Sequence, residues 1–418
     1  MRTPKGTRAF YPEKAEKRRL LREKIEDAVK SCGFTQIQTP FFEGARVYAD
    51  KSGEEIVDQL FSLDEEIGDE QLVLTPELTP TIGKMVSSKK QKLKEPIKWY
   101  NTQRFWRYEE PQQGRFREFW QTNIDIFGGE EPIPETELLC LSVRIFSELG
   151  INKDQMSIKI SDRRILENLI REFSTDNNIE EIMKIVDKKR KLEQEDFKYQ
   201  LEEKGVNNVE RFTEILEINK ITELEEKTDL DIESIKILFK EINNLNLEGW
   251  IELDLSVSRG VDYYTGIVFE AFDETGAINR SILGGGRYDN LTQMYGGENT
   301  PAAGMAIGYA PLEEALAEYG LLEEENSIDL YVIRFEETSN KTAEISESLR
   351  EKGYSVESPV KERSISSQFS LADSRGASYV IVPGPTEISK GKVTVKNLET
   401  GTENKVKIQN IEGEIDNI

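Results

Sequence analysis

The apolar residues of this chain recur at intervals that predict helices and strands. Residues 13–32 carry Leu21, Ile25 and Val29 four residues apart, which is the spacing of one buried helix face. A strand-like segment ending at Pro40 follows. The N-terminal region therefore predicts one amphipathic helix that leads into a strand.

Residues 97–127 predict a long β-hairpin, because the side chains of the return strand alternate between two kinds. One face is mainly apolar and includes Trp120, Ile124 and Ile126. Burying the opposite, polar face without a ligand would cost free energy, so this face is a candidate binding surface. Its members are Arg117, Phe119, Gln121, Asn123 and Asp125, with Arg115 added if the strand extends that far.

A second candidate lies in LTPELTPT, residues 74–81. We expect a strand that reaches Glu77, followed by a helix with Thr79 as N-cap and Pro80 in its first turn. The Glu77 carboxylate would then lie beside a helix start. The alternative without a functional role is a capped helix whose glutamate is exposed to solvent.

Changes in composition and in the spacing of apolar residues divide the rest of the chain into further regions. Residues 163–246 are rich in Lys, Glu, Ile and Leu at helical spacing, lack proline and contain the basic run Lys188–Lys191, which predicts a helical insertion in a β-rich domain. Strands resume after the insertion. From Asp329 strands and helices alternate, which predicts a separate α/β domain.

The chain of 418 residues contains no histidine. This excludes Ser-His-Asp triads, Cys-His pairs and histidine-liganded zinc or haem. Catalysis must then rest on carboxylates, arginine, lysine, tyrosine or backbone groups. The formal net charge of −24 argues against nucleic-acid binding through bulk charge, although a local basic patch stays possible.

The expected compartment of the protein and the state of its cysteines follow from segments and residue types that the sequence does not contain. It has no run of about 18 apolar residues and no apolar N-terminal leader. Its two cysteines are too few for a disulfide framework or a four-thiolate zinc site. We therefore expect a cytoplasmic protein without a membrane partner.

Three further segments carry candidate chemistry, and each has a structural alternative. Residues 104–121, RFWRYEEPQQGRFREFWQ, interleave four arginines with aromatic residues, which suits a polyanion, although the arginines could instead pair with glutamates of the same hairpin. SRGVDYYTG (258–266) is equally compatible with a turn and core tyrosines. In GGGRYDN (284–290) glycines permit close approach to a ligand, but such runs are also ordinary turns.

In this order, these segments resemble the histidyl-tRNA synthetase family of class II aminoacyl-tRNA synthetases, in an archaeal-looking form. The resemblance rests on KGTRAFYPE, DKSGEEIVD, TPELTPT, the arginine hairpin (similar to motif 2), RGVDYYTG (similar to the histidine-recognition segment) and GGGRYDNL with PAAGMAIG (similar to motif 3). It covers roughly the first 310 residues, and the last ninety or so resemble the family's anticodon-binding domain.

The resemblance implies an α+β fold with a class II antiparallel sheet flanked by helices. Residues 1–162 and 247–322 would form the catalytic core, 163–246 a helical insertion and 327–418 an α/β anticodon-binding domain. It further implies an ATP-dependent ligase that attaches histidine to tRNA(His) through a histidyl-adenylate, with Mg²⁺. Family members are homodimers, and Pro40 lies in the segment similar to the dimer-forming motif 1.

The resemblance also implies roles in the ATP site. Arg107 matches the arginine that holds the α-phosphate, and Arg259 matches an arginine that assists there and at the histidine carboxylate. Arg115 matches a residue that reaches the β- and γ-phosphates. Glu109 and Arg117 belong to the same ATP-binding set.

Roles in the histidine pocket follow in the same way. Glu77 and Thr79 match positions facing the α-amino group, and Asp125 and Tyr264 match positions facing the imidazole. The remaining pocket residues are Gln121, Tyr263 and, at the carboxylate, Arg259.

The chain departs from the family at several positions. Many relatives end motif 3 with an arginine, but Pro311 occupies that place here. Arg115 or Arg117 is then expected to carry more of the ATP contact. Tyr108 and Trp120 stand where bacterial relatives often have histidine.

Two alternatives remain within this fold. The synthetase-like regulatory subunit of ATP phosphoribosyltransferase is a non-catalytic partner in histidine biosynthesis, but such paralogues typically lack the anticodon-binding domain and degrade the arginine motifs. The second alternative is a class II ligase for another amino acid. The amino acid that supports pyrophosphate exchange would identify it.

Overall fold

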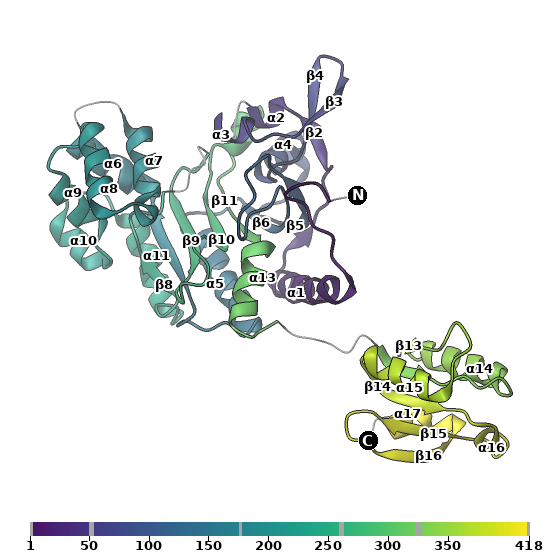
Figure 1. The fold of residues 1–418 in the computed structure, drawn as a ribbon. Helices are drawn as coiled ribbons and strands as arrows, with labels where there is room; N and C mark the ends of the chain where they lie inside the picture. Colours follow the sequence, from purple (N-terminus) through teal and green to yellow (C-terminus); the bar gives the residue numbers. More distant parts are fainter. Residues whose placement is uncertain (1–2, 50–53, 175–177, 259–262, 323–327, 416–418) are drawn as a thin grey trace. The chain divides into compact units, whose positions relative to one another are not determined.

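We analysed the protein in a computed structural model that describes residues 3–49, 54–174, 178–258, 263–322 and 328–415. The chain forms two compact units, Met1–Leu322 and Glu323–Ile418, which are described separately (Figure 1). No helix within the described residues is long and apolar enough to cross a membrane.

An eight-stranded sheet forms the centre of the first unit, with strand order β1-β5-β6-β11-β10-β9-β7-β8. All neighbouring pairs are antiparallel except β1 with β5 and β7 with β8 at the two edges. The predicted α+β class with a mainly antiparallel sheet is therefore confirmed. The strands are β1 (Thr35–Gln36), β5 (Ile97–Trp106), β6 (Glu118–Phe127), β7 (Met156–Asp162), β8 (Ile251–Leu253), β9 (Ile267–Asp273), β10 (Leu283–Arg287) and β11 (Ala302–Gly308).

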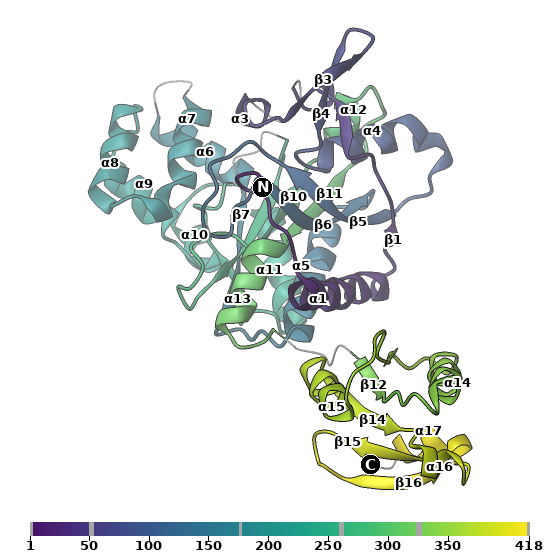
Figure 2. The same cartoon turned by 45° about the vertical axis from the view of Figure 1, so that its right-hand side comes forward.

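Helices α1 (Pro12–Ser31), α5 (Ile133–Glu148) and α13 (Tyr309–Glu318) pack on one face of this sheet (Figure 2). The apolar stripe of α1 predicted from the sequence is buried there, against Ile124 and Ile126 of β6. The opposite face of the sheet thus remains available for a ligand.

The hairpin predicted at 97–127 is confirmed as β5 and β6, which pair from Ile97 with Phe127 to Trp106 with Glu118. Arg115 lies outside the strand, because Gln112 and Arg115 close a tight turn through two backbone hydrogen bonds of 2.9 and 3.1 Å. Its position in the loop means that its direction does not follow the strand alternation.

The start of helix α4 (Thr79–Lys89) differs from the prediction. Strand β4 (Glu70–Leu74) ends before Glu77, and Leu78 occupies the N-cap position without a side-chain cap bond. Because Leu78 is fully buried in the core, the helix begins one residue earlier than expected. Thr79 is thus the first helical residue. The neighbouring three-stranded sheet has the order β2-β4-β3, with β2 (Phe42–Gly44) and β3 (Ser62–Ile67), and the short helices α2 (Arg46–Ala49), α3 (Glu54–Val57) and α12 (Leu291–Met294) lie in the same unit.

The glycine run at 284–286 is neither a turn nor a loop, because it forms the middle of strand β10, between β9 and β11. A Cβ at Gly285 would lie 2.6 Å from the Phe269 ring, and one at Gly286 would lie 2.9 Å from the Tyr264 ring. Side chains at these positions would therefore displace the aromatic groups that cover the strand.

The region predicted as a helical insertion is helical in the structure. Residues Ile182, Val186, Phe197 and Leu201, which carry the helical spacing, are buried. These residues belong to the same buried apolar cluster as the central sheet of the first unit, so the insertion packs onto that core. Its helices are α6 (Arg163–Phe173), α7 (Ile179–Asp187), α8 (Gln194–Glu203), α9 (Val209–Leu216), α10 (Ile221–Lys227) and α11 (Glu233–Asn244).

The second unit contains a five-stranded sheet with the order β13-β12-β14-β15-β16. Strands β12, β13 and β14 are parallel, and β15 and β16 form an antiparallel hairpin. Leu330, Ile381 and Val393 belong to its own core. The elements are β12 (Ile328–Val332), α14 (Ser339–Arg350), β13 (Val356–Glu357), α15 (Ile365–Ser374), β14 (Ala377–Val382), α16 (Pro385–Ile388), β15 (Lys392–Asn397), β16 (Glu403–Lys407) and α17 (Ile411–Ile415).

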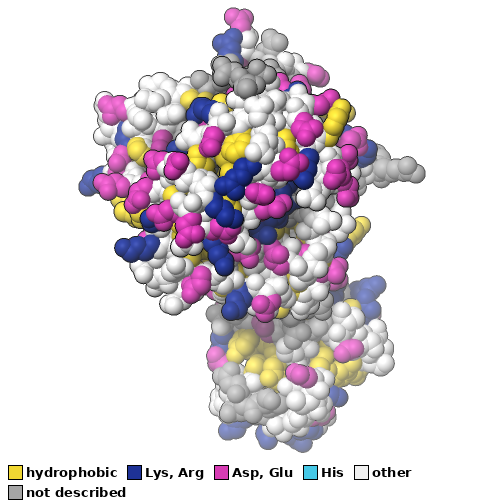
Figure 3. Space-filling view, turned by 90° about the vertical axis from the view of Figure 1, so that its left-hand side faces the viewer, with side chains coloured by type: hydrophobic (Ala, Val, Ile, Leu, Met, Phe, Trp, Pro, Cys, Tyr) yellow, Lys and Arg dark blue, Asp and Glu magenta, His cyan; other side chains and the backbone are white. Residues whose placement is uncertain are grey.

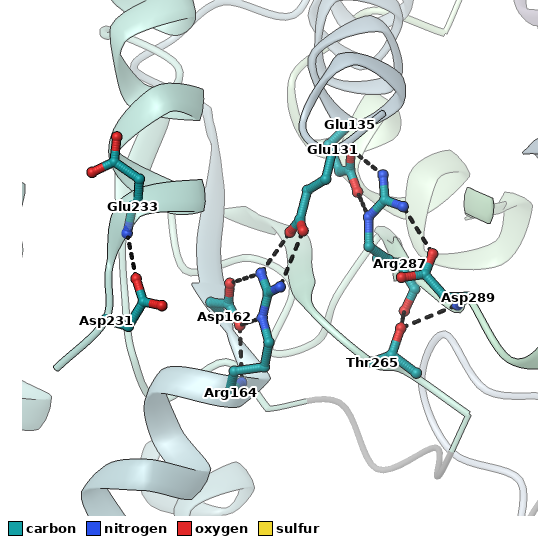
Figure 4. A network of polar contacts seen from close by, with 9 residues as sticks. All are labelled: Glu131, Glu135, Asp162, Arg164, Asp231, Glu233, Thr265, Arg287 and Asp289. Carbon is teal, nitrogen blue, oxygen red and sulfur yellow. Dashed lines mark hydrogen bonds and ion pairs between the residues drawn. The ribbon is translucent and has the colours of Figure 1, made fainter. Parts of the chain in front are cut away.

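A buried ion pair joins the central sheet to α5 (Figure 4). The Arg287 guanidinium donates to both carboxylate oxygens of Glu135 at 2.5 and 3.0 Å, and both side chains are almost completely buried. Arg287 also donates to Asp289, whose backbone N–H donates to the Thr265 hydroxyl at 3.1 Å. This network fixes the end of β10 relative to the segment that precedes β9.

The same figure shows a second, more exposed cluster, in which Arg164 bridges Glu131 and Asp162. The Arg164 side chain is 42% exposed, compared with 2% for Arg287. Solvent therefore screens the charge of Arg164 far more than that of Arg287.

We predict that Arg287→Met destabilises the first unit by about 3–5 kcal/mol, because it leaves Glu135 buried without its counter-charge. Arg171→Ala is the control and should cost at most ~1 kcal/mol, because Arg171 is 58% exposed and its partner Glu167 is also partly exposed. Denaturant unfolding followed by tryptophan fluorescence measures the first unit alone, because Trp99, Trp106, Trp120 and Trp250 all lie in it. Equal losses in the two variants would contradict the importance of burial.

Candidate functional site

A cavity of about 780 Å³ opens on the face of the sheet opposite α1 and α5. Its walls come from segments that are far apart in the sequence: the start of α4, the β5–β6 hairpin, the segment before β9, and strands β10 and β11. Eight of the predicted site residues line it, namely Glu77, Thr79, Arg107, Arg115, Gln121, Asp125, Tyr263 and Tyr264.

One end of the cavity is built around Asp125. This carboxylate is 3% exposed and accepts a hydrogen bond from the Tyr288 hydroxyl. Burial raises the pKa of Asp125 from 3.8 to about 7, an effect that the Tyr288 hydrogen bond partly opposes. Its second oxygen has no hydrogen-bond partner, and the Asn123 amide nitrogen beside it is also unpartnered. Both groups are thus available to a polar ligand.

Gly304 of β11 makes this arrangement possible. A Cβ at this position would collide with the Tyr288 hydroxyl and with Asp125, so no other residue fits without moving the pair. In the sequence, the only functional signals of the PAAGMAIG segment are its glycines and its similarity to motif 3. In the structure, the segment contributes to the cavity through Gly304, which leaves room for Tyr288 and Asp125 because it has no side chain.

Aromatic rings enclose the same end. Tyr263 and Tyr264 lie 4.9 Å apart between ring centroids, and Tyr288 lies 5.9 and 6.2 Å from them. The Tyr263 hydroxyl donates to Glu77 at 3.4 Å, and Glu77 is 6% exposed. A ligand that carries a flat polar ring and a neighbouring positive charge would therefore contact the tyrosine faces and the carboxylates of Glu77 and Asp125.

The other end of the cavity is basic. Arg107 donates from Nε to the Pro76 carbonyl at 3.0 Å and lies over Phe119, which fixes its direction. Arg115 pairs with Glu109. A second cavity of about 350 Å³ shares Arg107, Arg115 and Gln121 with the first and adds Glu109. An anionic ligand could extend from one cavity into the other.

Arg117 is not brought to either cavity. It precedes β6, donates from Nε to the Glu109 carbonyl at 2.8 Å and lies 4.1 Å from the Tyr108 ring centroid. Its side chain also packs against Gly6, so it supports the base of the hairpin. Arg259 lies outside the described residues.

Several lining residues were missed by the sequence reasoning. Asn123 had been recognised on the polar strand face but not as a site residue, and Tyr288 stood inside the GGGRYDN segment. Arg280, in the connection between β9 and β10, carried no motif signal at all. Strand alternation already placed Asn123 on the candidate binding face, whereas the family resemblance gave it no role.

The insertion also reaches the cavity. Asp187, Arg190 and Lys191 belong to its lining. Arg190 donates to Asp254 at 2.9 Å and lies over the Phe272 ring, whereas Ser258 donates to Asp187 at 3.4 Å. The basic run is therefore partly held by contacts within the protein.

Acidic and basic side chains are interspersed on one face of the molecule (Figure 3). In the face shown in Figure 3, Lys and Arg side chains alternate with Asp and Glu. No group of three or more acidic or cysteine side chains placed to hold a metal occurs within the described residues.

Comparison with known proteins decides the family. The family model for histidyl-tRNA synthetase matches residues 6–312, and that for the anticodon binding domain matches residues 329–418. The chain belongs to the histidyl-tRNA synthetase family. It is 39% identical to the histidine–tRNA ligase of Haloarcula marismortui, with 99% of this chain and 97% of that protein covered.

Solved structures agree at the level of fold. Histidyl-tRNA synthetase from Nostoc sp. PCC 7120 superposes with a TM-score of 0.86 at 23% identity and covers 100% of this chain and 99% of that chain. A Bacillus halodurans protein described as an ATP phosphoribosyltransferase regulatory subunit/histidyl-tRNA synthetase gives 0.74 at 18% identity, covering 88% and 96%. The fold alone thus does not separate an enzyme from a regulatory subunit.

We predict that Asp125→Asn stabilises the unliganded protein at pH 8 by more than ~1.4 kcal/mol, the equivalent of one pKa unit. Between pH 4 and 7 the native protein binds more protons than the unfolded chain, because the pKa of Asp125 is raised to about 7. Its contribution to stability is therefore lost as the pH rises through this range.

The measurement is tryptophan-monitored unfolding of wild type and variant at pH 5 and pH 8. The advantage of the variant should shrink at pH 5, where the native carboxyl is protonated. A constant difference at both pH values would show that ionisation of Asp125 is not its cause.

Proposed function

We propose that this protein attaches histidine to tRNA(His) in two steps with ATP. The observation that carries the proposal is a pair of adjoining cavities that share lining residues, with a buried acidic and aromatic end and an arginine-lined end. A zwitterionic amino acid with a polar ring fits the first end, and a polyphosphate fits the second. The family membership and the match of 329–418 to an anticodon binding domain agree with this assignment.

In the histidine pocket, Glu77 and Thr79 would bind the α-amino group, with Gln121 beside it. Asp125 and Tyr264 would bind the two ring nitrogens, and Tyr263 would orient Glu77 through its hydroxyl. A wrong amino acid would leave Asp125 and Asn123 buried without partners. Sites of this kind can reject analogues by factors on the order of 10⁴ without editing.

The first step is attack of a histidine carboxylate oxygen on the α-phosphorus of ATP. The new O–P bond forms as the bond to the bridging oxygen breaks, and pyrophosphate leaves with that electron pair. Histidine is already ionised at this group, so the protein needs no base. Its contribution is positioning and charge stabilisation, which we assign to Arg107, Arg259 and Arg115.

Glu109 is assigned to the ATP site because it orients Arg115 through their ion pair. Arg117 then acts indirectly, by supporting the hairpin. Magnesium would enter as part of the substrate, held mainly by phosphate oxygens and water, as Mg²⁺ usually is at nucleotide sites.

In the second step a hydroxyl of the terminal tRNA ribose attacks the carbonyl carbon of the adenylate. Its proton passes to a phosphate oxygen, and AMP leaves. No histidine base is required, which suits a chain without imidazole groups.

We assign residues 1–162 and 247–322 to the catalytic core, 163–246 to the insertion and 327–418 to anticodon binding. Exposed Lys188 and Lys191 would face the tRNA acceptor stem. We further propose a cytoplasmic homodimer, supported by Phe41 and Phe42, which are 56% and 48% exposed next to Pro40.

The regulatory-subunit alternative is less well supported. Such a subunit has no need for an anticodon-binding domain or for an arginine-lined nucleotide site. Here residues 329–418 match the anticodon binding domain model, and Arg107, Arg115 and Arg280 line the smaller cavity.

The decisive test is ATP–pyrophosphate exchange with each of the twenty amino acids. We expect exchange with histidine alone, followed by charging of tRNA(His). Exchange supported by another amino acid would identify a different ligase, and no exchange with any amino acid would favour a regulatory role.

Within this assay, Arg259→Ala should reduce histidine-dependent exchange by at least about 100-fold, the loss typical of removing one charge-stabilising donor. Arg104→Ala is the control, since Arg104 is exposed and pairs with Glu118 on the outer part of the hairpin. Near-normal exchange in a folded Arg259 variant would refute its assignment.

A further inference from the structure

We propose that Arg280 binds the pyrophosphate end of ATP and supplies the positive charge that motif 3 lacks at Pro311. This inference rests on the proposed function, because it names one more residue of the same site. Arg280 belongs to none of the motifs through which the family was recognised.

Position is the first argument. Arg280 lies between β9 and β10 and lines both the larger and the smaller cavity, as Arg107 and Arg115 do. Unlike Asp125 and Tyr264, these three arginines all belong to the smaller cavity. Arg280 is therefore at the basic end and away from the pocket proposed for the imidazole.

Its neighbour in the hairpin is the second argument. A Cβ at Gly114 would lie 3.2 Å from Cδ of Arg280 and 3.6 Å from its Nε, so the arginine side chain runs alongside the turn. Gly114 has φ +65° and immediately precedes Arg115. The two guanidinium groups thus belong to adjoining parts of the same wall.

Glu314 of α13 lies at the same turn. It accepts a hydrogen bond from the Gly114 N–H at 2.9 Å, and its other carboxylate oxygen would lie 3.3 Å from a Cβ at Gly114. The turn is held between Glu314 and the stem of Arg280. Arg280 is therefore half-buried by packing, while its head group stays at the cavity.

Freedom from internal pairing is the third argument. Arg107 is bound to the Pro76 carbonyl, Arg115 to Glu109 and Arg117 to the Glu109 carbonyl. Among the residues that the structure describes, none forms a hydrogen bond or ion pair with the Arg280 guanidinium. The Glu314 carboxylate lies near the same turn but forms no ion pair with Arg280. A phosphate chain would provide the guanidinium with a direct partner of opposite charge.

Pro311 lies in the wall of the same smaller cavity. It is buried and contributes neither charge nor donor from its side chain. A guanidinium that enters from the β9–β10 connection can therefore replace one that would otherwise come from α13. Arg115 and Arg117 are the residues that the sequence suggests as replacements for the motif 3 arginine. Arg117 lines neither cavity, and Arg115 is already paired with Glu109. Arg280 is therefore the better candidate.

The test compares Arg280→Met, which keeps the stem that packs on Gly114, with Arg280→Lys and with Arg171→Met, an exposed arginine of α6 as matched control. Binding of ATP and AMP to the full-length protein is measured by calorimetry, together with KM values for ATP, pyrophosphate and histidine in the exchange assay. Arg280→Met should weaken ATP binding and kcat/KM for ATP by about 10- to 100-fold, the usual effect of losing one charge-assisted hydrogen bond. AMP binding and the KM for histidine should change less than about twofold.

Equal loss of ATP and AMP binding, or an Arg280→Met variant that behaves like wild type, would overturn the proposal. Pro311→Arg in the Arg280→Met background provides a second arm, in which recovered ATP binding supports replacement of one guanidinium by the other. ATP binding that depends on Arg280 in a protein without histidine-dependent exchange would contradict the proposed function while leaving this inference intact.

Discussion

The ion pair between Glu135 and Arg287 is the constraint on which the site depends. Two opposite charges buried this deeply stay favourable only while they remain in contact, so α5 and β10 have one allowed register. The next residue after Arg287 is Tyr288, whose hydroxyl meets Asp125 on β6. A shift of β10 by one residue would reverse the faces of its side chains and dissolve this contact.

The glycines of β10 and β11 belong to the same arrangement. Because Gly285 and Gly286 carry no side chains, Phe269 and Tyr264 can lie directly over the strand. Gly304 likewise leaves room for Tyr288 and Asp125. Gly284 and Gly304 line the cavity with backbone, while its other walls are side chains held by packing and hydrogen bonds. Such a site is preformed before a ligand arrives, which suits catalysis by positioning.

Much of this organisation could be predicted from the sequence, because local patterns determine it. Strand alternation identified the hairpin and brought Gln121 and Asp125 to one face, and helical spacing identified α1 and the insertion. The start of α4 was predicted one residue late, since burial of Leu78 outweighs the capping preference of Thr79.

What could not be predicted depends on contacts between distant segments. The glycine run is a strand only because β9 and β11 flank it, and no local signal distinguishes it from a turn. The direction of Arg117 is set by Gly6 and Tyr108, which lie outside the alternating strand. Arg280 became visible as a site residue only when the β9–β10 connection was placed against the hairpin turn.

The cluster of Tyr263, Tyr264 and Tyr288 has a spectroscopic consequence. The chain contains no imidazole of its own, so in a proton NMR spectrum of the complex every imidazole resonance belongs to added histidine. Ring currents from tyrosines packed this closely would move the C2 and C4 proton signals of a bound histidine away from their free positions. With a ¹³C label in the ring of the added histidine, the protonation state of the substrate could then be followed without any imidazole signal from the protein.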